Sequence, residues 1–181
     1  MNLYRIRPLP VDTALNGYRL LLTTKVIELV ASMLPKRVDG RSHENVLYLA
    51  GSIDGITRCA FEVVVPKAKT APGSYTTSRD SHAEVLWNLS NRNLVVVGQV
   101  HCHPGGAVYH SDADDDLAFI KGEGFWSIVV PNYGEDGMIP LSSCGFHCYS
   151  NHAFRLLKEP AVSNRVIVAK DRPDQKKGGS A

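Results

Sequence analysis

The chain has 181 residues, of which 44% are hydrophobic and 21% charged, with a formal net charge of +2. These values predict one globular domain with a full core, and they argue against a nucleic-acid partner. The longest apolar stretches are too short to span a bilayer, and the first residues lack the apolar segment of a secretion signal. The four cysteines do not suggest a disulfide framework, so we expect a cytoplasmic protein with no membrane partner.

In the first half of the chain, helices are predicted at 24–34 and 79–91, and strands at 45–51 and 56–66. The first helix has apolar residues at helical spacing, Thr24 as a candidate N-cap and Pro35 after its end. Ser78 is the candidate cap of the second helix. The segments 35–44 and 67–77 are rich in turn-forming residues and are predicted to be loops.

The elements predicted in the second half are four strands, at 94–101, 125–131, 144–150 and 165–170. The first of them is almost continuously apolar, which is typical of a central strand covered on both faces. A third helix is predicted to begin at Ser111 and to continue to Lys121. The segment 171–181 is polar and predicted to be disordered, so a single domain is expected over residues 1–170. The whole pattern predicts a mixed sheet flanked by helices.

Two histidines one residue apart end the strand at 94–101. Side chains at i and i+2 of a strand share a face, so His101 and His103 can reach one point while Cys102 faces away. Imidazole is a common transition-metal ligand, and a catalytic zinc keeps three protein ligands and one open position. A third ligand is expected from the aspartates that follow, which are Asp112, Asp114, Asp115 and Asp116.

Each of these features also has a purely structural explanation. A pair of histidines at a strand end is often only a polar exit from the sheet. Ser111 and Asp114 have the spacing of a capping box, and Asp115 and Asp116 suit the positive end of a helix dipole. The combination in one order and spacing favours the metal site.

That order resembles the JAMM metalloproteases, also called MPN-plus or JAB-domain proteins. Their motif is a distant glutamate, His-x-His, seven residues and then Ser-x-x-Asp. Here His101 and His103 are followed by the seven residues PGGAVYH and then by Ser111 and Asp114. The resemblance covers about residues 20–150, and it is nearest to the compact prokaryotic JAB proteins.

The family's glutamate precedes a strand, in a pattern similar to the segment ENVLYLAG. Glu44 takes the place of that glutamate, whereas Leu47 stands where glycine is usual. Glu62, in the following strand, is the alternative. Cys102 replaces the usual serine or threonine, and we expect this change to be tolerated because the side chain points away from the metal.

The resemblance implies an α/β domain with a mixed curved sheet, similar to the cytidine deaminase fold. It also implies one Zn²⁺ ion held by His101, His103 and Asp114, with Glu44 as general base and Ser111 as the oxyanion donor. The implied reaction hydrolyses an amide or isopeptide bond that follows the C-terminus of a ubiquitin-like protein. Many compact prokaryotic relatives are encoded beside such proteins and their activating and conjugating enzymes, including in antiphage systems. The alternatives are a protease that trims a sulfur-carrier protein and a non-catalytic MPN scaffold.

A second set of potential metal ligands lies near the C-terminus, comprising Cys144, His147, Cys148 and His152. Strand alternation places the two cysteines on one face and His147 on the other, so a core strand is favoured over a second zinc site. His110 is predicted near the surface at the mouth of the site, while Trp87 and Trp126 are predicted to be core aromatics. The final KKGGSA resembles an unprocessed ubiquitin-like tail, although a flexible tail is favoured.

Overall fold

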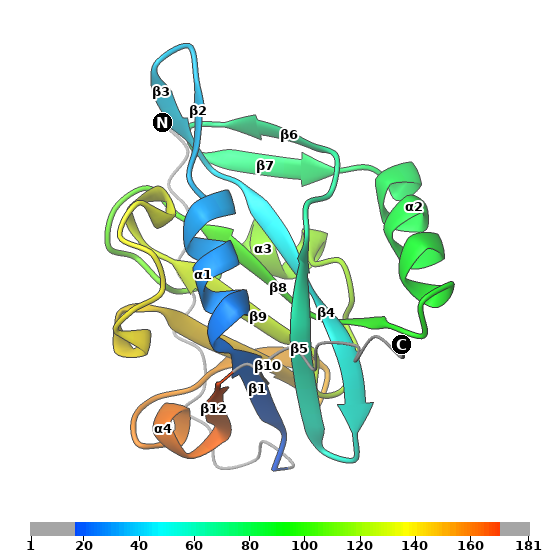
Figure 1. The fold of residues 1–181 in the computed structure, drawn as a ribbon. Coiled ribbons are helices and arrows are strands. Elements are labelled where there is room, and N and C mark those ends of the chain that lie inside the picture. The colour runs from blue at the N-terminus through cyan, green and yellow to red at the C-terminus, as the bar shows by residue number, and fades with distance from the viewer. Residues whose placement is uncertain (1–16, 171–181) are drawn as a thin grey trace, which may run out of the picture.

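The computed structural model describes residues 17–170, and its centre is an eight-stranded mixed sheet (Figure 1). The order of its strands is β11-β10-β9-β8-β4-β5-β1-β12. β4 is antiparallel to β5 and β8, whereas β8 and β9 are parallel. In chain order the eight strands are β1 (Arg19–Thr23), β4 (Val46–Asp54), β5 (Thr57–Val64), β8 (Val95–Cys102), β9 (Trp126–Val130), β10 (Gly145–Ser150), β11 (Ala153–Leu156) and β12 (Val166–Ala169). The predicted mixed sheet is confirmed, although β1 and β11 were not predicted.

Two hairpins stand at one end of this sheet, at the top of Figure 1. They pair β2 (Lys36–Val38) with β3 (Arg41–His43) and β6 (Ala68–Ala71) with β7 (Ser74–Thr77). The prediction that 35–44 and 67–77 are loops is therefore wrong, because each segment contains a hairpin. In the first hairpin, Asp39 and Gly40 both have positive φ, as a two-residue turn of type I′ requires. The Asp-Gly pair was a hairpin signal that the flanking polar residues obscured.

Helix α1 (Thr24–Met33) packs on one face of the sheet and begins at Thr24, the residue that was predicted to cap it. The cap is Thr23 rather than Thr24, since the Thr23 side chain accepts a hydrogen bond from the backbone of Val26. Helix α2 (Arg79–Ser90) starts after Ser78, which caps it as predicted. A short helix α4 (Ala161–Arg165) precedes β12, and two 3-10 turns occupy Asn132–Gly134 and Leu141–Ser143.

Helix α3 (Asp112–Leu117) is shorter than predicted, because the chain becomes extended at Ala118. The Phe119 backbone N–H donates to the Gln99 side chain instead of to a helical carbonyl. The Phe119 ring packs on Tyr48 and His82. The packing of this partly buried ring therefore ends the helix at Leu117, before the predicted end at Lys121.

The sheet separates two hydrophobic clusters. Leu47 and Leu49 of β4 belong to the cluster under α1, whereas Tyr48 belongs to the cluster under α2. Trp126 lies in the first cluster and is fully buried, as predicted. Trp87 was predicted to be a core residue and is instead 70% exposed, because α2 turns Val85 and Leu89 toward the sheet. No helix within residues 17–170 is both long and apolar enough to cross a membrane.

Candidate metal centre

The structure brings His101, His103 and Asp114 together at the end of β8. One ligand atom from each lies within 4.8 Å of those from the other two. The Nε2 atom of His101 is 3.3 Å from Asp114 Oδ1, and that of His103 is 3.2 Å from Asp114 Oδ2. Within the described part of the chain, no other group of three such side chains converges in this way. The geometry therefore supports Asp114 as the third ligand among the candidate aspartates.

The other aspartates of α3 are engaged elsewhere or face solvent. Asp115 Oδ1 lies 2.8 Å from Nδ1 of His110, and the Asp116 side chain is 82% exposed. Asp114 is the member of the series that the helix turns back toward β8, and it is buried. A helix that begins at residue 112 therefore presents one carboxylate to the histidines.

Local hydrogen bonds orient the ligands before any ion binds. The His103 ring places Nδ1 3.2 Å from the Ala107 carbonyl, which directs Nε2 toward Asp114. Ser111 and Asp114 form a reciprocal capping box, in which Ser111 Oγ accepts from the Asp114 backbone and the Asp114 carboxylate accepts from the Ser111 backbone. The cap and the ligand set, which the sequence presented as alternatives, therefore coexist in the same residues.

The chemistry of the three side chains fits a divalent cation. His101 is fully buried, its Nδ1 has no hydrogen-bond partner among the described residues, and its Nε2 has only the 3.3 Å contact with Asp114 Oδ1. Burial alone would raise the pKa of Asp114, but the adjacent His101 and His103 rings hold it well below its usual range. A buried ionised carboxylate beside an unsatisfied imidazole is an environment that a metal ion stabilises, and two nitrogens with one carboxylate oxygen suit zinc.

Glu44 lies at the same site, directly after β3. Its side chain lines a pocket together with His103 and Asp114 and is 8% exposed. Burial raises the pKa of Glu44 to about 7, with His103 lowering it and Asp114 raising it further. Glu62, the alternative, forms an ion pair with Arg92 on an exposed part of the surface. The structure therefore brings Glu44 to the ligands, whereas Glu62 does not line this pocket.

Ser111 also lines the pocket, but its hydroxyl is already engaged. It donates to Asp114 Oδ2 at 2.7 Å. The sequence had suggested a hydroxyl hydrogen that faces the site, whereas here the hydrogen is directed at the carboxylate. The oxyanion role of Ser111 stays a prediction that requires this hydroxyl to rotate.

The pocket has a volume of about 270 Å³ and lies between β7 and α3. Residues 73–76 line one side, and much of the rest is apolar, with Tyr109 and Leu117 among its exposed side chains. Such a site excludes much of the solvent around the polar groups at its base, and electrostatic interactions there are correspondingly stronger.

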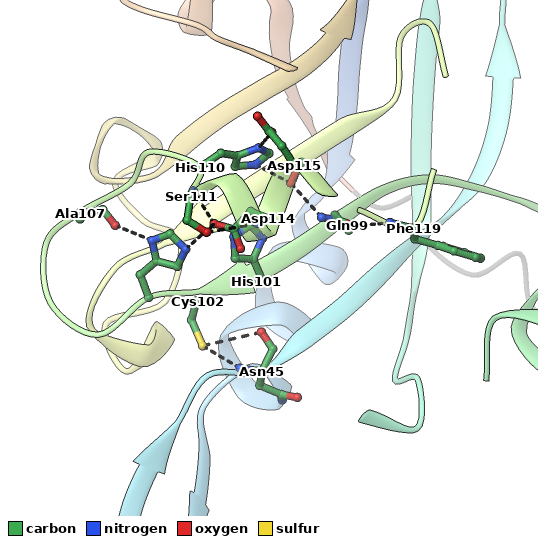
Figure 2. A network of polar contacts seen from close by, with 12 residues as sticks. Asn45, Gln99, His101, Cys102, Ala107, His110, Ser111, Asp114, Asp115 and Phe119 are labelled. Carbon is green, nitrogen blue, oxygen red and sulfur yellow. Dashed lines mark hydrogen bonds and ion pairs between the residues drawn. The ribbon is translucent and has the colours of Figure 1, made fainter. Parts of the chain in front are cut away.

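Cys102 points away from the histidines, as alternation predicts. Figure 2 shows its sulfur directed at Asn45, whose backbone N–H donates to it over 3.3 Å. The side chain belongs to the cluster under α1, and burial raises the pKa of its thiol to about 12. Cys102 is therefore a core residue on the opposite face of the strand from the ligands.

The second candidate group does not converge. Cys144 and Cys148 join the cluster under α1, His147 stacks on His110, and His152 occupies a turn with positive φ. The interpretation as a core strand is confirmed. His110 was predicted near the surface at the mouth of the site; it is instead buried, with 6% of it exposed, but it does line the pocket.

Comparison with known proteins identifies the family. The sequence profile of the prokaryotic homologs of the JAB domain matches residues 26–141, which is more than half of the chain. The chain belongs to this JAB family. The His-His-Asp group is consistent with the JAMM motif of that family.

Individual similar proteins match over a short stretch or at low sequence identity. A stretch of 59 residues is 39% identical to the "Probable metalloprotease y4jG" of Sinorhizobium fredii strain NGR234, and it covers 33% of this chain and 35% of that protein. The match therefore spans about a third of that relative. The solution structure of protein DSY2949 from Desulfitobacterium hafniense superposes with a TM-score of 0.62 at 16% identity, covering 84% of this chain and 94% of the other. It has the same fold.

A JAB1/MPN domain protein from Archaeoglobus fulgidus is also similar, with a TM-score of 0.43 and 14% identity over 85% of this chain and 99% of the other.

Proposed function

We propose that this JAB protein is a zinc metalloprotease that hydrolyses the amide or isopeptide bond after the C-terminus of a ubiquitin-like protein. One observation carries the proposal: His101, His103 and Asp114 converge on one another, and Glu44 lines the same pocket as His103 and Asp114. Three ligands with a nearby carboxylate of raised pKa are the components of metal-assisted hydrolysis. The similarity to the Sinorhizobium fredii protein named a probable metalloprotease supports the same activity.

His101, His103 and Asp114 would hold the ion. When bound, a divalent metal lowers the pKa of a coordinated water and polarises a carbonyl. Glu44 would take a proton from the attacking water and pass it to the leaving amine. Its pKa of about 7, a consequence mainly of burial, suits proton transfer near neutral pH. Ser111, at the start of α3, would turn its hydroxyl from Asp114 toward the developing oxyanion, a contribution of about 3 kcal/mol in comparable sites.

The substrate part of the proposal rests on the family resemblance. Compact prokaryotic JAB proteins are frequently encoded beside ubiquitin-like proteins, so we propose such a protein or its conjugate as substrate. We also propose that the partners are activating and conjugating enzymes of the same operon, in the cytoplasm and in an antiphage system. All four cysteines are free, which suits a reducing compartment.

Two other functions compete with this proposal. The first is trimming of a sulfur-carrier protein in biosynthesis, which the same residues would catalyse. Neighbouring genes separate the two, since conjugating enzymes favour deconjugation and biosynthetic enzymes favour trimming. The second is a scaffold without activity, which the intact set of ligands, Glu44 and Ser111 argues against.

The deciding experiment is cleavage of a fusion in which a candidate ubiquitin-like protein precedes a reporter. We expect zinc-loaded wild type to cut at the junction and the chelated protein to be inactive until zinc is returned. Glu44→Gln should keep its zinc and lose about two to four orders of magnitude in rate, because a positioned base contributes that much.

The matched control for this variant is Glu62→Gln, which removes an exposed ion-paired carboxylate and should cut at the wild-type rate. A fully active Glu44→Gln together with an inactive Glu62→Gln would show that the base has been misassigned. Zinc-loaded wild type that cuts no candidate fusion would reject the substrate class and favour the scaffold.

A further inference from the structure

His110 is a buried histidine that the proposed mechanism does not use. It precedes the N-cap of α3, and both of its ring nitrogens have polar neighbours. Nδ1 lies 2.8 Å from Asp115 Oδ1, and Nε2 lies 2.9 Å from the hydroxyl oxygen of Ser127 on β9. One face of the ring stacks on His147 of β10, with centroids 3.9 Å apart. The side chain therefore connects the start of α3 to two strands of the sheet.

The hydrogen bonds continue from Ser127 to the other end of α3. The Gln99 side chain donates from Nε2 to Ser127 Oγ over 3.2 Å, and Gln99 Oε1 accepts from the Phe119 backbone. Figure 2 shows this series running from Asp115 through His110 to Gln99 and Phe119. The start of the short helix is thus connected to β9 through His110, and the chain directly after the helix is connected to β8 through Phe119.

One arrangement of protons satisfies every group in the series. Ser127 Oγ accepts from Gln99, so its own hydrogen is available to Nε2 of His110. The Asp115 carboxylate can only accept, so Nδ1 of His110 carries the proton that the ring donates to it.

Helix α3 needs such an attachment. Six residues form fewer than two turns, and an isolated helix of that length is unstable in water. Yet this helix carries Asp114, whose position relative to His101 and His103 must be held within a fraction of an ångström for metal binding. The capping box fixes the first turn internally, but it does not connect that turn to the sheet.

We propose that His110 is a positioning residue, which holds the start of α3 against β9 through Asp115 and Ser127 and thereby places Asp114 opposite the two histidine ligands. This inference rests on the metal site of the proposed function, but it does not depend on which substrate the protein cleaves. Partners of this kind behind metal ligands typically contribute about 10- to 100-fold in metal affinity.

Substitutions of Asp115 separate the hydrogen bond from the charge. Asp115→Ala should bind Zn²⁺ about 10- to 100-fold more weakly than wild type, measured on the full chain by competition with a chelating indicator. Asp115→Asn loses the same charge but keeps an oxygen that accepts from Nδ1, so its affinity should stay within about threefold of wild type. Asp116→Ala removes a charge from the same helix without touching His110, and it should also bind normally.

A second pair of variants tests the ring itself. His110→Leu keeps apolar bulk but removes both hydrogen bonds, and it should weaken Zn²⁺ binding to the same extent as Asp115→Ala. The absorption spectrum of its Co²⁺ complex should differ from that of wild type, because the geometry of the ligands has changed. Val30→Ala is the control, since Val30 belongs to the cluster under α1, whereas Phe119 packs against the cluster on the other face of the sheet. It should lower resistance to urea and leave both metal affinity and spectrum unchanged.

The outcomes are distinct from those of the proposed function. Equal weakening in Asp115→Asn and Asp115→Ala would show a charge effect and overturn the inference, as would wild-type affinity in Asp115→Ala or in a folded His110→Leu. If His110→Leu does not fold, the two Asp115 variants decide. Wild type that binds zinc but cuts no fusion would reject the proposed substrate and leave the role of His110 intact. Wild type that binds no zinc would reject both.

Discussion

The ends of β8 and β10 carry similar residues and form different structures. Each has histidine and cysteine within a few positions, yet only β8 contributes to a convergent group of ligands. His101 and His103 share one face at the end of their strand, and α3 returns from the following loop with Asp114. In β10, Cys148 faces α1 while His147 faces the other side. Composition alone therefore does not predict a metal site.

The difference also lies in what covers each strand. Both strands are paired on both edges, but the side chains of β10 enter packed layers on both faces. β8 ends beside a pocket, and His103, directly after the strand, lines it. A metal site built on two strand residues at i and i+2 needs a third ligand from a separate element and an open coordination position for water or substrate. Of the two strands, only β8 has such a ligand and an adjacent pocket.

The largest expected effect is the loss of the β8 group. His101→Ala, His103→Ala and Asp114→Ala should each purify with much less zinc and without activity, because one missing ligand of three leaves the others unable to hold the ion. Metal analysis of the purified variants, alongside wild type, checks this. A full equivalent of zinc in Asp114→Ala would move the third ligand to Asp112, Asp115 or Asp116.

Substitutions of the cysteines in and directly before β10 should, in contrast, affect stability and not metal binding. Cys144→Ala and Cys148→Ala remove buried sulfur atoms from the cluster under α1, at a cost of about 1 kcal/mol of unfolding free energy each. Neither change should alter the zinc content, which should be one equivalent per chain in wild type. Urea unfolding and metal analysis measure the two quantities. A second equivalent in wild type that disappears in Cys148→Ala would indicate a metal site at β10.

The rate of thiol alkylation allows β8 and β10 to be compared within one protein. Burial raises the pKa of Cys102 to about 12 and that of Cys144 to about 11. A higher pKa leaves less reactive thiolate below that pH, so both should resist alkylation at pH 8, at least tenfold more than the partly exposed Cys59. Mass spectrometry of the labelled peptides gives the rates. Native Cys102 that reacts as fast as Cys59 would contradict its burial, whereas urea should abolish the difference.

Sequence patterns predicted the parts of this site that depend on neighbours along the chain. Strand alternation separated Cys102 from His101 and His103, and Ser111 was identified as the residue at the start of a helix. The resemblance to JAMM proteins singled out Asp114 and Glu44, which spacing alone had left among several candidates. The third ligand depends on how a loop returns to the strand, and no local pattern encodes that path.

The remaining differences arise from contacts between distant segments. Helix α3 ends early because Phe119 packs on Tyr48, and Trp87 is exposed because Val85 and Leu89 take the buried side of α2. The burial of His110 depends on Ser127 and on His147, which lie 17 and 37 positions later in the chain. Its position directly before the N-cap gave no sign of these partners. The segment 171–181 lies outside the described residues, so its predicted disorder is not tested.

The smallest expected effect concerns Cys102, which lies between the two ligand histidines and belongs to the opposite face of β8. Cys102→Ser should keep its zinc and most of its activity, because the serine oxygen can accept the hydrogen bond from the Asn45 backbone that the sulfur now accepts. Replacing a buried thiol by a hydroxyl should lower the unfolding free energy by about 1 kcal/mol, because the more polar group is less favourable in the core. Zinc content and urea unfolding of the same preparation separate these effects. Loss of zinc from a fully folded Cys102→Ser would mean that residue 102 contributes to the ligand face, and the contrast between the two faces of β8 would then be wrong.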